Sequence, residues 1–240
     1  MPSEHRIGSW EHHQQKFQNV SELDSARLVL DASVFDLSLS PKQIDQLELY
    51  AGLVVKWNKH FNLIARPDIR RLQDRHLLDS LAIARLLRGH KILDLGSGAG
   101  LPGIPLAIVN PDKDFVLCDR MGRRCRFLTQ VVRELGLDNV GVVEGEVPSA
   151  VSGLFDVVTA RAVASPAVLW GWVEDLLETG GRLLVFANTR RDEADSEVDT
   201  TGADDDEKSA LPDNRVKVTY HEYKIAQLQK VHTLMGLERA

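Results

Sequence analysis

The sequence predicts an α/β fold in which a mostly parallel sheet carries helices on both faces, with a small helical cap before it. Two observations support this prediction. After residue 89, short apolar runs alternate with helix-like segments, which is the order typical of parallel β-α units. Before residue 89, apolar residues recur at helical spacing. A chain of 240 residues, 43% of them hydrophobic, is long enough to bury one substantial core.

The helical cap is expected over residues 39–89. Ser40 and Pro41 are typical of an N-cap followed by proline in the first helical turn. Helical periodicity follows over residues 42–63, and a second helical pattern covers residues 72–86. We therefore expect two helices in the cap.

The main domain is expected over residues 90–240. Its strands are predicted at residues 91–95, 114–119, 140–145, 155–160, 181–187 and 215–225, and its helices at residues 102–110, 122–135 and 165–178. The last fifteen residues, AQLQKVHTLMGLERA, fit neither pattern clearly.

Two further segments are expected to contribute little to the core. Residues 1–38 are predicted to be a weakly ordered extension, with one helix near Val20 to Leu30. Residues 190–212 are predicted to be a flexible acidic segment, because Asp192 to Glu207 contains nine acids and no base.

The composition excludes several classes of protein. No stretch approaches the roughly 20 apolar residues of a membrane-spanning helix, and the N-terminus lacks the apolar centre of a signal peptide, so we expect a cytoplasmic protein. Cys118 and Cys125 give neither a disulfide framework nor the spacing of a metal site, and no bound metal is expected.

The net charge of −6 is unevenly distributed, because the acidic segment carries nine negative charges and the rest of the chain sums to +3. Lys56 to Lys91 contains nine Lys or Arg against three Asp, and Arg120 to Arg126 contains four arginines and no acid. These clusters are typical of phosphate-binding surfaces, although a solvated charged face remains the alternative.

A glycine-rich turn follows the first predicted strand, in the sequence KILDLGSGAGLPGIPLA. Gly96, Gly98 and Gly100 would let a ligand approach the backbone before a helix. Such a turn can bind a dinucleotide, another nucleotide or S-adenosylmethionine. Asp94 favours the last, because a carboxylate there would repel a pyrophosphate and attract an ammonium group, unless it only caps the turn. Asp119, at the end of the next strand, could bind the ribose hydroxyls of either NAD or S-adenosylmethionine.

Residues 47–186 resemble the RsmG family, also called GidB, of bacterial ribosomal RNA methyltransferases. The resemblance rests on five segments in the same order as in the family, which are WNKHFNL (57–63), RHLLDSL (75–81), LDLGSGAGLPGIPLAI (93–108), RRCRFL (123–128) and FDVVTARAVA (155–164). It implies a Rossmann-like class I S-adenosylmethionine-dependent methyltransferase fold, and methylation of a guanine at nitrogen-7 in 16S ribosomal RNA, naked or within the small subunit. A monomer is expected.

The resemblance also implies a set of site residues. Gly96 and Leu101 match glycine-loop positions, and Arg161 matches the arginine of the family's SRA motif, so Arg161 is expected to contact the cofactor or a phosphate. Val147 and Pro148 stand where the family places an acidic adenine-binding motif. The predicted cofactor-binding residues are therefore Asp94, Gly96, Gly98, Gly100, Leu101, Asp119, Val147, Pro148 and Arg161.

Three departures from the family bear on activity. EVP at 146–148 replaces the acidic motif, FAN at 186–188 replaces ALKG, and the family's closing strand is not recognisable, which predicts an altered sheet edge. The alternatives are therefore an RNA-binding protein of this fold with weak or lost methyl transfer, and an NAD-dependent dehydrogenase.

The expected reaction requires few catalytic groups. Guanine nitrogen-7 has an exposed lone pair and no proton to lose, so no general base is expected, and alignment of the reactants supplies most of the catalysis. His76 and Asp79 share a helical face, where a hydrogen bond between helices is favoured over a metal site. The arginines expected to contact RNA phosphates are Arg66, Arg75, Arg123, Arg124 and Arg126.

Overall fold

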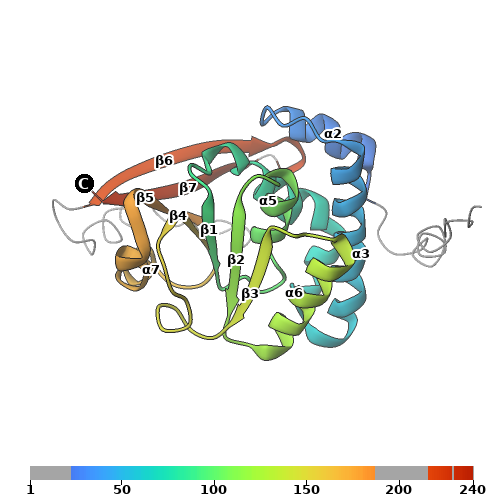
Figure 1. Ribbon diagram of the computed structural model, residues 1–240. Coiled ribbons are helices and arrows are strands. Elements are labelled where there is room, and N and C mark those ends of the chain that lie inside the picture. Colours follow the sequence, from blue (N-terminus) through green and yellow to red (C-terminus); the bar gives the residue numbers. More distant parts are fainter. Residues whose placement is uncertain (1–22, 187–215, 229, 240) are drawn as a thin grey trace, which may run out of the picture.

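The computed structural model describes residues 23–186, 216–228 and 230–239, so the predicted acidic segment lies outside the described residues. The described chain forms a seven-stranded sheet in the order β3-β2-β1-β4-β5-β7-β6 (Figure 1). Five strands are parallel, and β7 runs antiparallel to both β5 and β6. The strands are β1 (Lys91–Leu95), β2 (Asp114–Asp119), β3 (Val140–Glu144), β4 (Phe155–Arg161), β5 (Leu177–Phe186), β6 (Val216–Ile225) and β7 (Lys230–Arg239).

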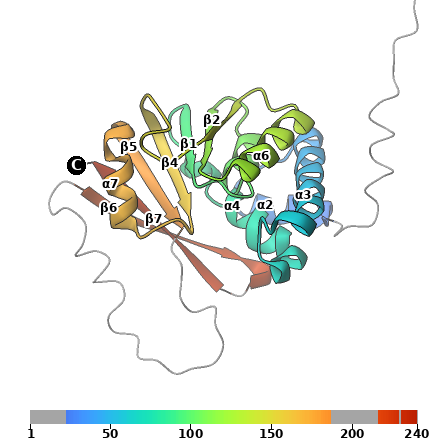
Figure 2. The same cartoon turned by 90° about the horizontal axis from the view of Figure 1, so that it is seen from below.

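Helices cover both faces of the sheet, as Figure 2 shows from below. On one face lie α5 (Gly103–Val109) and α6 (Gly122–Leu135), with α3 (Pro41–Phe61) packed outside them. On the other face, α7 (Pro166–Val173) packs against β5. Alternation along β1 divides the core, because Ile92 faces one layer and Leu93 the other.

Local sequence explains the long helix α3. Ser40 accepts a hydrogen bond from the Gln43 backbone and the Gln43 side chain accepts one from the Ser40 backbone, a capping box, with Pro41 in the first turn. The helix ends at Asn62, whose φ of 44° is left-handed. Its buried face packs against α5 and α6 through Leu47, Tyr50, Leu53, Val54 and neighbouring residues. Each large apolar side chain buried in this way contributes up to about 1.5–3 kcal/mol.

The second helix expected in the cap is instead four short segments. They are the 3-10 helix η1 (Arg66–Arg71), the π-helix η2 (Leu72–Leu77), α4 (Leu78–Leu81) and the 3-10 helix η3 (Ala84–Leu86). Helical periodicity does not distinguish these hydrogen-bonding patterns. The π-turn lies directly beside the cavity described below, a common location for such irregularities.

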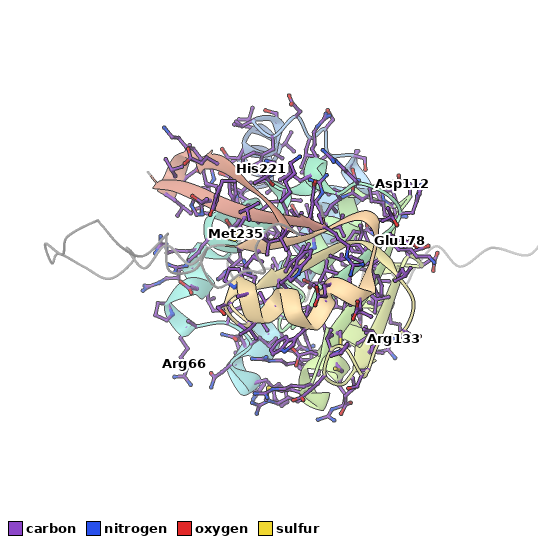
Figure 3. All side chains as sticks on the ribbon, turned by 90° about the vertical axis from the view of Figure 1, so that its left-hand side faces the viewer. Arg66, Asp112, Arg133, Glu178, His221 and Met235 are labelled. Carbon is purple, nitrogen blue, oxygen red and sulfur yellow. The ribbon has the colours of Figure 1, made fainter. Side chains whose placement is uncertain are left out.

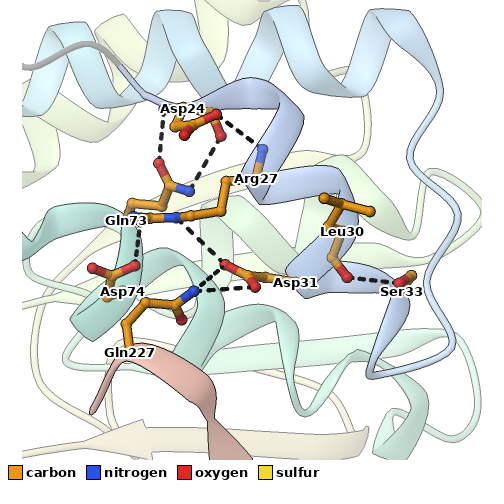
Figure 4. Close-up of polar contacts among 8 residues, drawn as sticks. All are labelled: Asp24, Arg27, Leu30, Asp31, Ser33, Gln73, Asp74 and Gln227. Atoms are coloured by element: carbon orange, nitrogen blue, oxygen red, sulfur yellow. Dashed lines mark hydrogen bonds and ion pairs between the residues drawn. The ribbon is translucent and has the colours of Figure 1, made fainter.

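Residues 23–38 are more firmly packed than predicted for a weakly ordered extension. Helix α2 (Ser25–Ser33) buries Leu28 and Ala32 completely. Figure 4 shows the polar contacts of its other side: Arg27 pairs with Asp74 and the Asp24 backbone donates to Gln73, both in the cap, whereas Gln227, between β6 and β7, donates to Asp31.

The C-terminal part of the sheet differs from the prediction in two ways. Strand β5 starts at Leu177, so α7 ends at Val173 and only a 3-10 turn, η4 (Glu174–Leu176), follows it. The ambiguous last segment forms a short 3-10 turn, η5 (Ala226–Leu228), and then strand β7 between β5 and β6. Strand β7 pairs along its length with β6 and with the end of β5, and the prediction that this edge differs from that of the family stays a prediction.

No helix in the described part of the chain has the length and apolar character needed to cross a bilayer.

Candidate active site

A cavity of about 370 Å³ lies beyond the carboxyl ends of β1, β4 and β5. The glycine turn (Gly96–Leu101) forms one wall, the cap contributes another, and the β6–β7 hairpin closes a third with Tyr223, His232 and Thr233. The strand order reverses between β1 and β4, and open α/β sheets bind their ligands at such a switch point.

The glycine turn presents bare backbone to this cavity. Gly96 and Gly98 have φ values of +68° and +59°, which side chains rarely adopt. A Cβ on Gly96 would come within 2.6 Å of Val163, whereas a Cβ on Gly98 would meet only the Gly96 carbonyl, at 3.7 Å. The turn is fixed from behind, because the amides of Gly96 and Ser97 both donate to the carbonyl of Cys118.

Asp94 lies behind the turn and is absent from the described residues that line the cavity. It is 1% exposed, and its carboxylate accepts hydrogen bonds from the Gly103 amide (3.1 Å) and the Thr159 hydroxyl (2.8 Å). Burial raises the pKa of this carboxyl to about 6, against the opposing effect of its hydrogen bonds. In this structure the carboxylate caps the turn, and its predicted contact with a ligand ammonium stays a prediction.

Asp119 also holds the turn. Its Oδ2 accepts from the Gly98 amide at 2.9 Å and its Oδ1 from the Met121 amide at 2.9 Å, while Arg124 lies 3.4 Å from Oδ2. Asp119 is only 2% exposed and does not itself line the cavity, whereas Arg124 does. Its predicted contact with ribose stays a prediction.

The cap also fixes the turn, through a residue inside the helix predicted over residues 42–63. The Tyr50 hydroxyl, fully buried on α3, donates to the Ala99 carbonyl at 2.7 Å. Burial raises the pKa of Tyr50, so this hydroxyl stays protonated and remains a donor. A tyrosine at the inward face of a helix predicts burial, but not this partner.

Asp79 is the centre of a polar cluster where the cap meets the β6–β7 hairpin at the cavity. It accepts hydrogen bonds from the Tyr223 hydroxyl (2.5 Å) and from His232 Nδ1 (3.1 Å), and Arg161 lies 3.5 Å from its other oxygen. Burial alone would raise the pKa of Asp79, but these three partners together lower it, so the carboxylate is ionised. The expected hydrogen bond of Asp79 to another helix is therefore wrong, since two of its partners come from the hairpin.

His76 also lines the cavity, without a hydrogen-bond partner for either ring nitrogen among the described residues. Burial, together with the nearby charge of Arg161, lowers the pKa of this imidazole to about 3, despite the opposing charge of Asp79. His76 is therefore neutral at physiological pH and presents one donor and one acceptor.

Some of the other predicted residues line the cavity and some do not. Gly96, Gly98, Leu101 and Arg161 line the cavity with the RNA candidates Arg75 and Arg124. Gly100 does not, and a Cβ added there would clash with Ile104 and Leu128. Val147 and Pro148 follow β3 and are not among the described lining residues. The exposed candidates outside the cavity are Arg66, which points outward in Figure 3, and Arg123 and Arg126.

Within the described ranges, no three His, Cys, Asp or Glu side chains are grouped closely enough to hold a metal ion.

The sheet order and the glycine turn define a Rossmann-like fold. A methyltransferase of Pyrococcus furiosus shares the fold with a TM-score of 0.51, at 14% identity over 81% of this chain and 96% of that one. An S-adenosylmethionine-dependent methyltransferase of Aquifex aeolicus has a TM-score of 0.50, at 18% identity over 70% and 91% of the two chains. The predicted fold class is confirmed.

The chain belongs to the family described as rRNA small subunit methyltransferase G, or GidB, which it matches over residues 43–217. The ribosomal RNA small subunit methyltransferase G of Alteromonas mediterranea is 42% identical over 166 residues, or 66% of this chain and 76% of that protein. That of Shewanella halifaxensis is 36% identical over 83% of this chain and 90% of that one.

These matches confirm the family and the methyltransferase class, with S-adenosylmethionine as the cofactor of that class. The dehydrogenase alternative is wrong. The roles of individual site residues, and the division into extension, cap and main domain, stay predictions.

Proposed function

We propose that this protein transfers a methyl group from S-adenosylmethionine to nitrogen-7 of a guanine in 16S ribosomal RNA. One observation carries the proposal beyond family membership. The bare glycine turn and the Asp79 cluster face the same cavity, so a cofactor site and a polar site for a base adjoin one another.

The residues present fit the proposed cofactor. A Cβ on Gly98 would meet only the Gly96 carbonyl, at 3.7 Å, so the backbone there leaves room for a ligand to approach closely. The departure at 146–148 concerns the predicted adenine contact and leaves the glycine turn intact, because the turn is held by Tyr50, Asp94 and Asp119.

In this proposal the cofactor supplies an electrophilic methyl group on a good leaving group. The protein positions the base and excludes water, and alignment of this kind is worth roughly 7–11 kcal/mol in favourable cases. Arg161 is held in place by Asp79 and by the ring of Phe186, whose centroid lies 5.9 Å from its guanidinium carbon. Because the methylated base is cationic, a guanidinium tied to a carboxylate opposes the reaction less than an unpaired one.

The charged surface beside the cavity suits an RNA backbone. Arg75 and Arg124 lie at its wall, and the exposed side chains of Arg66, Arg123 and Arg126 extend the positive charge outward. Such contacts position an RNA without reading its sequence. A cytoplasmic monomer acting on RNA or on the small subunit is the form that we propose.

Transfer of a labelled methyl group to small-subunit RNA tests the proposal. We expect label in RNA from cells that lack this modification, and digestion to nucleosides should identify it as 7-methylguanosine. Naked RNA and assembled subunits, assayed in parallel, will show which state is the substrate. Calorimetric binding of the cofactor without any transfer to either substrate would favour the alternative, an RNA-binding protein that has lost methyl transfer.

A further inference from the structure

His232 stands at the end of the cavity away from the glycine turn. The turn follows β1, and His232 lies on β7, three strands further along the sheet. Neighbouring strands are about 4.8 Å apart, so roughly 14 Å separates the two strands. That span accommodates the reacting end of a cofactor and a purine base.

The contacts of His232 determine how its ring is protonated. Because Asp79 is an ionised carboxylate and only accepts hydrogen bonds, His232 Nδ1 must carry the proton that it shares with Asp79 at 3.1 Å. The imidazole also stacks on Tyr223, with ring centroids 5.3 Å apart and planes 22° apart. Since the Tyr223 hydroxyl itself donates to Asp79, both rings are fixed on the same carboxylate.

The second ring nitrogen of His232 is the unexplained atom. Nε2 is buried and has no hydrogen-bond partner among the described residues, while its residue lines the cavity. A buried polar atom without a partner costs about 1–3 kcal/mol, and at the wall of a binding cavity a ligand can supply that partner.

We infer that His232 Nε2 accepts a hydrogen bond from the Watson–Crick edge of the target guanine, at N1–H or the exocyclic amine, with Asp79 and Tyr223 as positioning residues. This inference rests on the proposed function. The two donors lie on the edge of guanine away from nitrogen-7, so a base held in this way leaves nitrogen-7 free to attack the methyl group.

The electrostatics of the reaction favour the neutral imidazole, whose Nε2 is an acceptor. Methylation makes the base cationic, and a second cation beside Arg161 would oppose it. A neutral acceptor on N1–H or the amine instead binds more strongly as positive charge develops. The same contact disfavours adenine, because adenine carries no amine at C2 and its N1 is an acceptor and not a donor.

The test combines two base analogues with substitutions of His232. Small-subunit RNA is ligated with guanosine, inosine or 1-deazaguanosine at the methylated position; inosine lacks the amine and 1-deazaguanosine lacks N1–H. With the unmodified protein, we expect at least one analogue to lower kcat/KM about threefold to tenfold. In His232→Phe this analogue and guanosine should react equally, at a rate below that of the unmodified protein.

Two controls separate this role from a structural one. His221→Phe alters another imidazole of the hairpin with a buried, unpartnered Nε2, one that does not line the cavity, and should keep the full analogue penalty. His232→Gln retains an acceptor and should restore part of the penalty. Calorimetry should give the same cofactor affinity for all variants. If His232→Phe does not fold, an analogue penalty that is smaller in His232→Gln than in the unmodified protein tests the inference, and an equal penalty would overturn it.

The outcomes are distinguishable. An analogue penalty that persists in His232→Phe, or the absence of any penalty with the unmodified protein, would overturn the inference and leave the proposed function in place. Failure of the unmodified protein to methylate natural RNA would overturn both.

Discussion

Replacement of Asp94 by Asn tests whether this carboxylate holds the glycine turn as a buried charge. Asn has nearly the same shape. Its side-chain carbonyl oxygen can accept a hydrogen bond from the Gly103 amide, and its side-chain amide NH2 can donate one to the Thr159 hydroxyl oxygen. The substitution therefore removes the ionisable group while leaving both partners satisfied.

The structure gives the size and the sign of the effect. Burial raises the pKa of Asp94 from 3.8 to about 6, so the folded protein binds this proton more tightly than the unfolded chain. The stability contributed by the protonated form is complete below the unfolded pKa and is lost as the pH rises through the folded one. The full loss is about 3 kcal/mol, of which about 2 kcal/mol falls between about pH 4.5 and about pH 7.5.

Urea denaturation of both proteins across this pH range measures the difference directly. The stability of Asp94→Asn relative to the unmodified protein should increase by about 2 kcal/mol from the acidic to the neutral end. Cofactor affinity at neutral pH should change little, because Asp94 does not line the cavity. Parallel stability curves would refute the argument from burial, and a cofactor affinity lowered a hundredfold would show that Asp94 meets the ligand after all.

Three further predictions follow from the site. Gly98→Val should abolish calorimetric cofactor binding, whereas Gly136→Val, with a similar φ of about +60° but not at the cavity, should bind normally. Loss of binding in both variants would show that backbone strain alone is responsible, and normal binding by Gly98→Val would place the turn outside the cofactor site. Asp79→Ala should lower the free energy of unfolding by about 3–5 kcal/mol, because it leaves the buried polar groups of Tyr223, His232 and Arg161 without their carboxylate partner. As a control, Asp138→Ala, at an exposed position, should lower it by less than about 0.5 kcal/mol. Arg123→Ala should reduce the slope of log RNA affinity against log salt by about 0.7–0.9, and an unchanged slope would place this arginine outside the RNA contact.

Local signals predicted the parallel part of the fold well. Helix α6 has the predicted bounds of residues 122–135, because an amphipathic pattern ends at Gly136, whose left-handed φ of 60° favours glycine. The strands β1 and β2 also match, since short apolar runs bounded by turns can form little else in an alternating chain.

The errors arose where distant contacts decide the structure. Strand β7 is defined by pairing with β5 and β6, and its own sequence lacks a clear alternation. Asp94 could be placed at the turn from sequence, but its partner Thr159 is 65 residues away and gives no local signal. Likewise, Asp79 and Tyr223 are 144 residues apart, so only the folded sheet shows that they meet.

The hydrogen bond from Tyr50 to Ala99 makes the cap and the ligand loop thermodynamically interdependent. A ligand that stabilises the ordered loop must also stabilise the packing of α3 against it. Conversely, a change that weakens the packing of α3 must reduce the binding free energy of the ligand by the same amount. Amide exchange along α3 should therefore slow when the cofactor binds, because the Tyr50 hydroxyl links the helix to the loop. The exchange rate of the α3 amides thus reflects whether the cofactor is bound, and an RNA that binds and stabilises the cap would in turn increase the affinity for the cofactor.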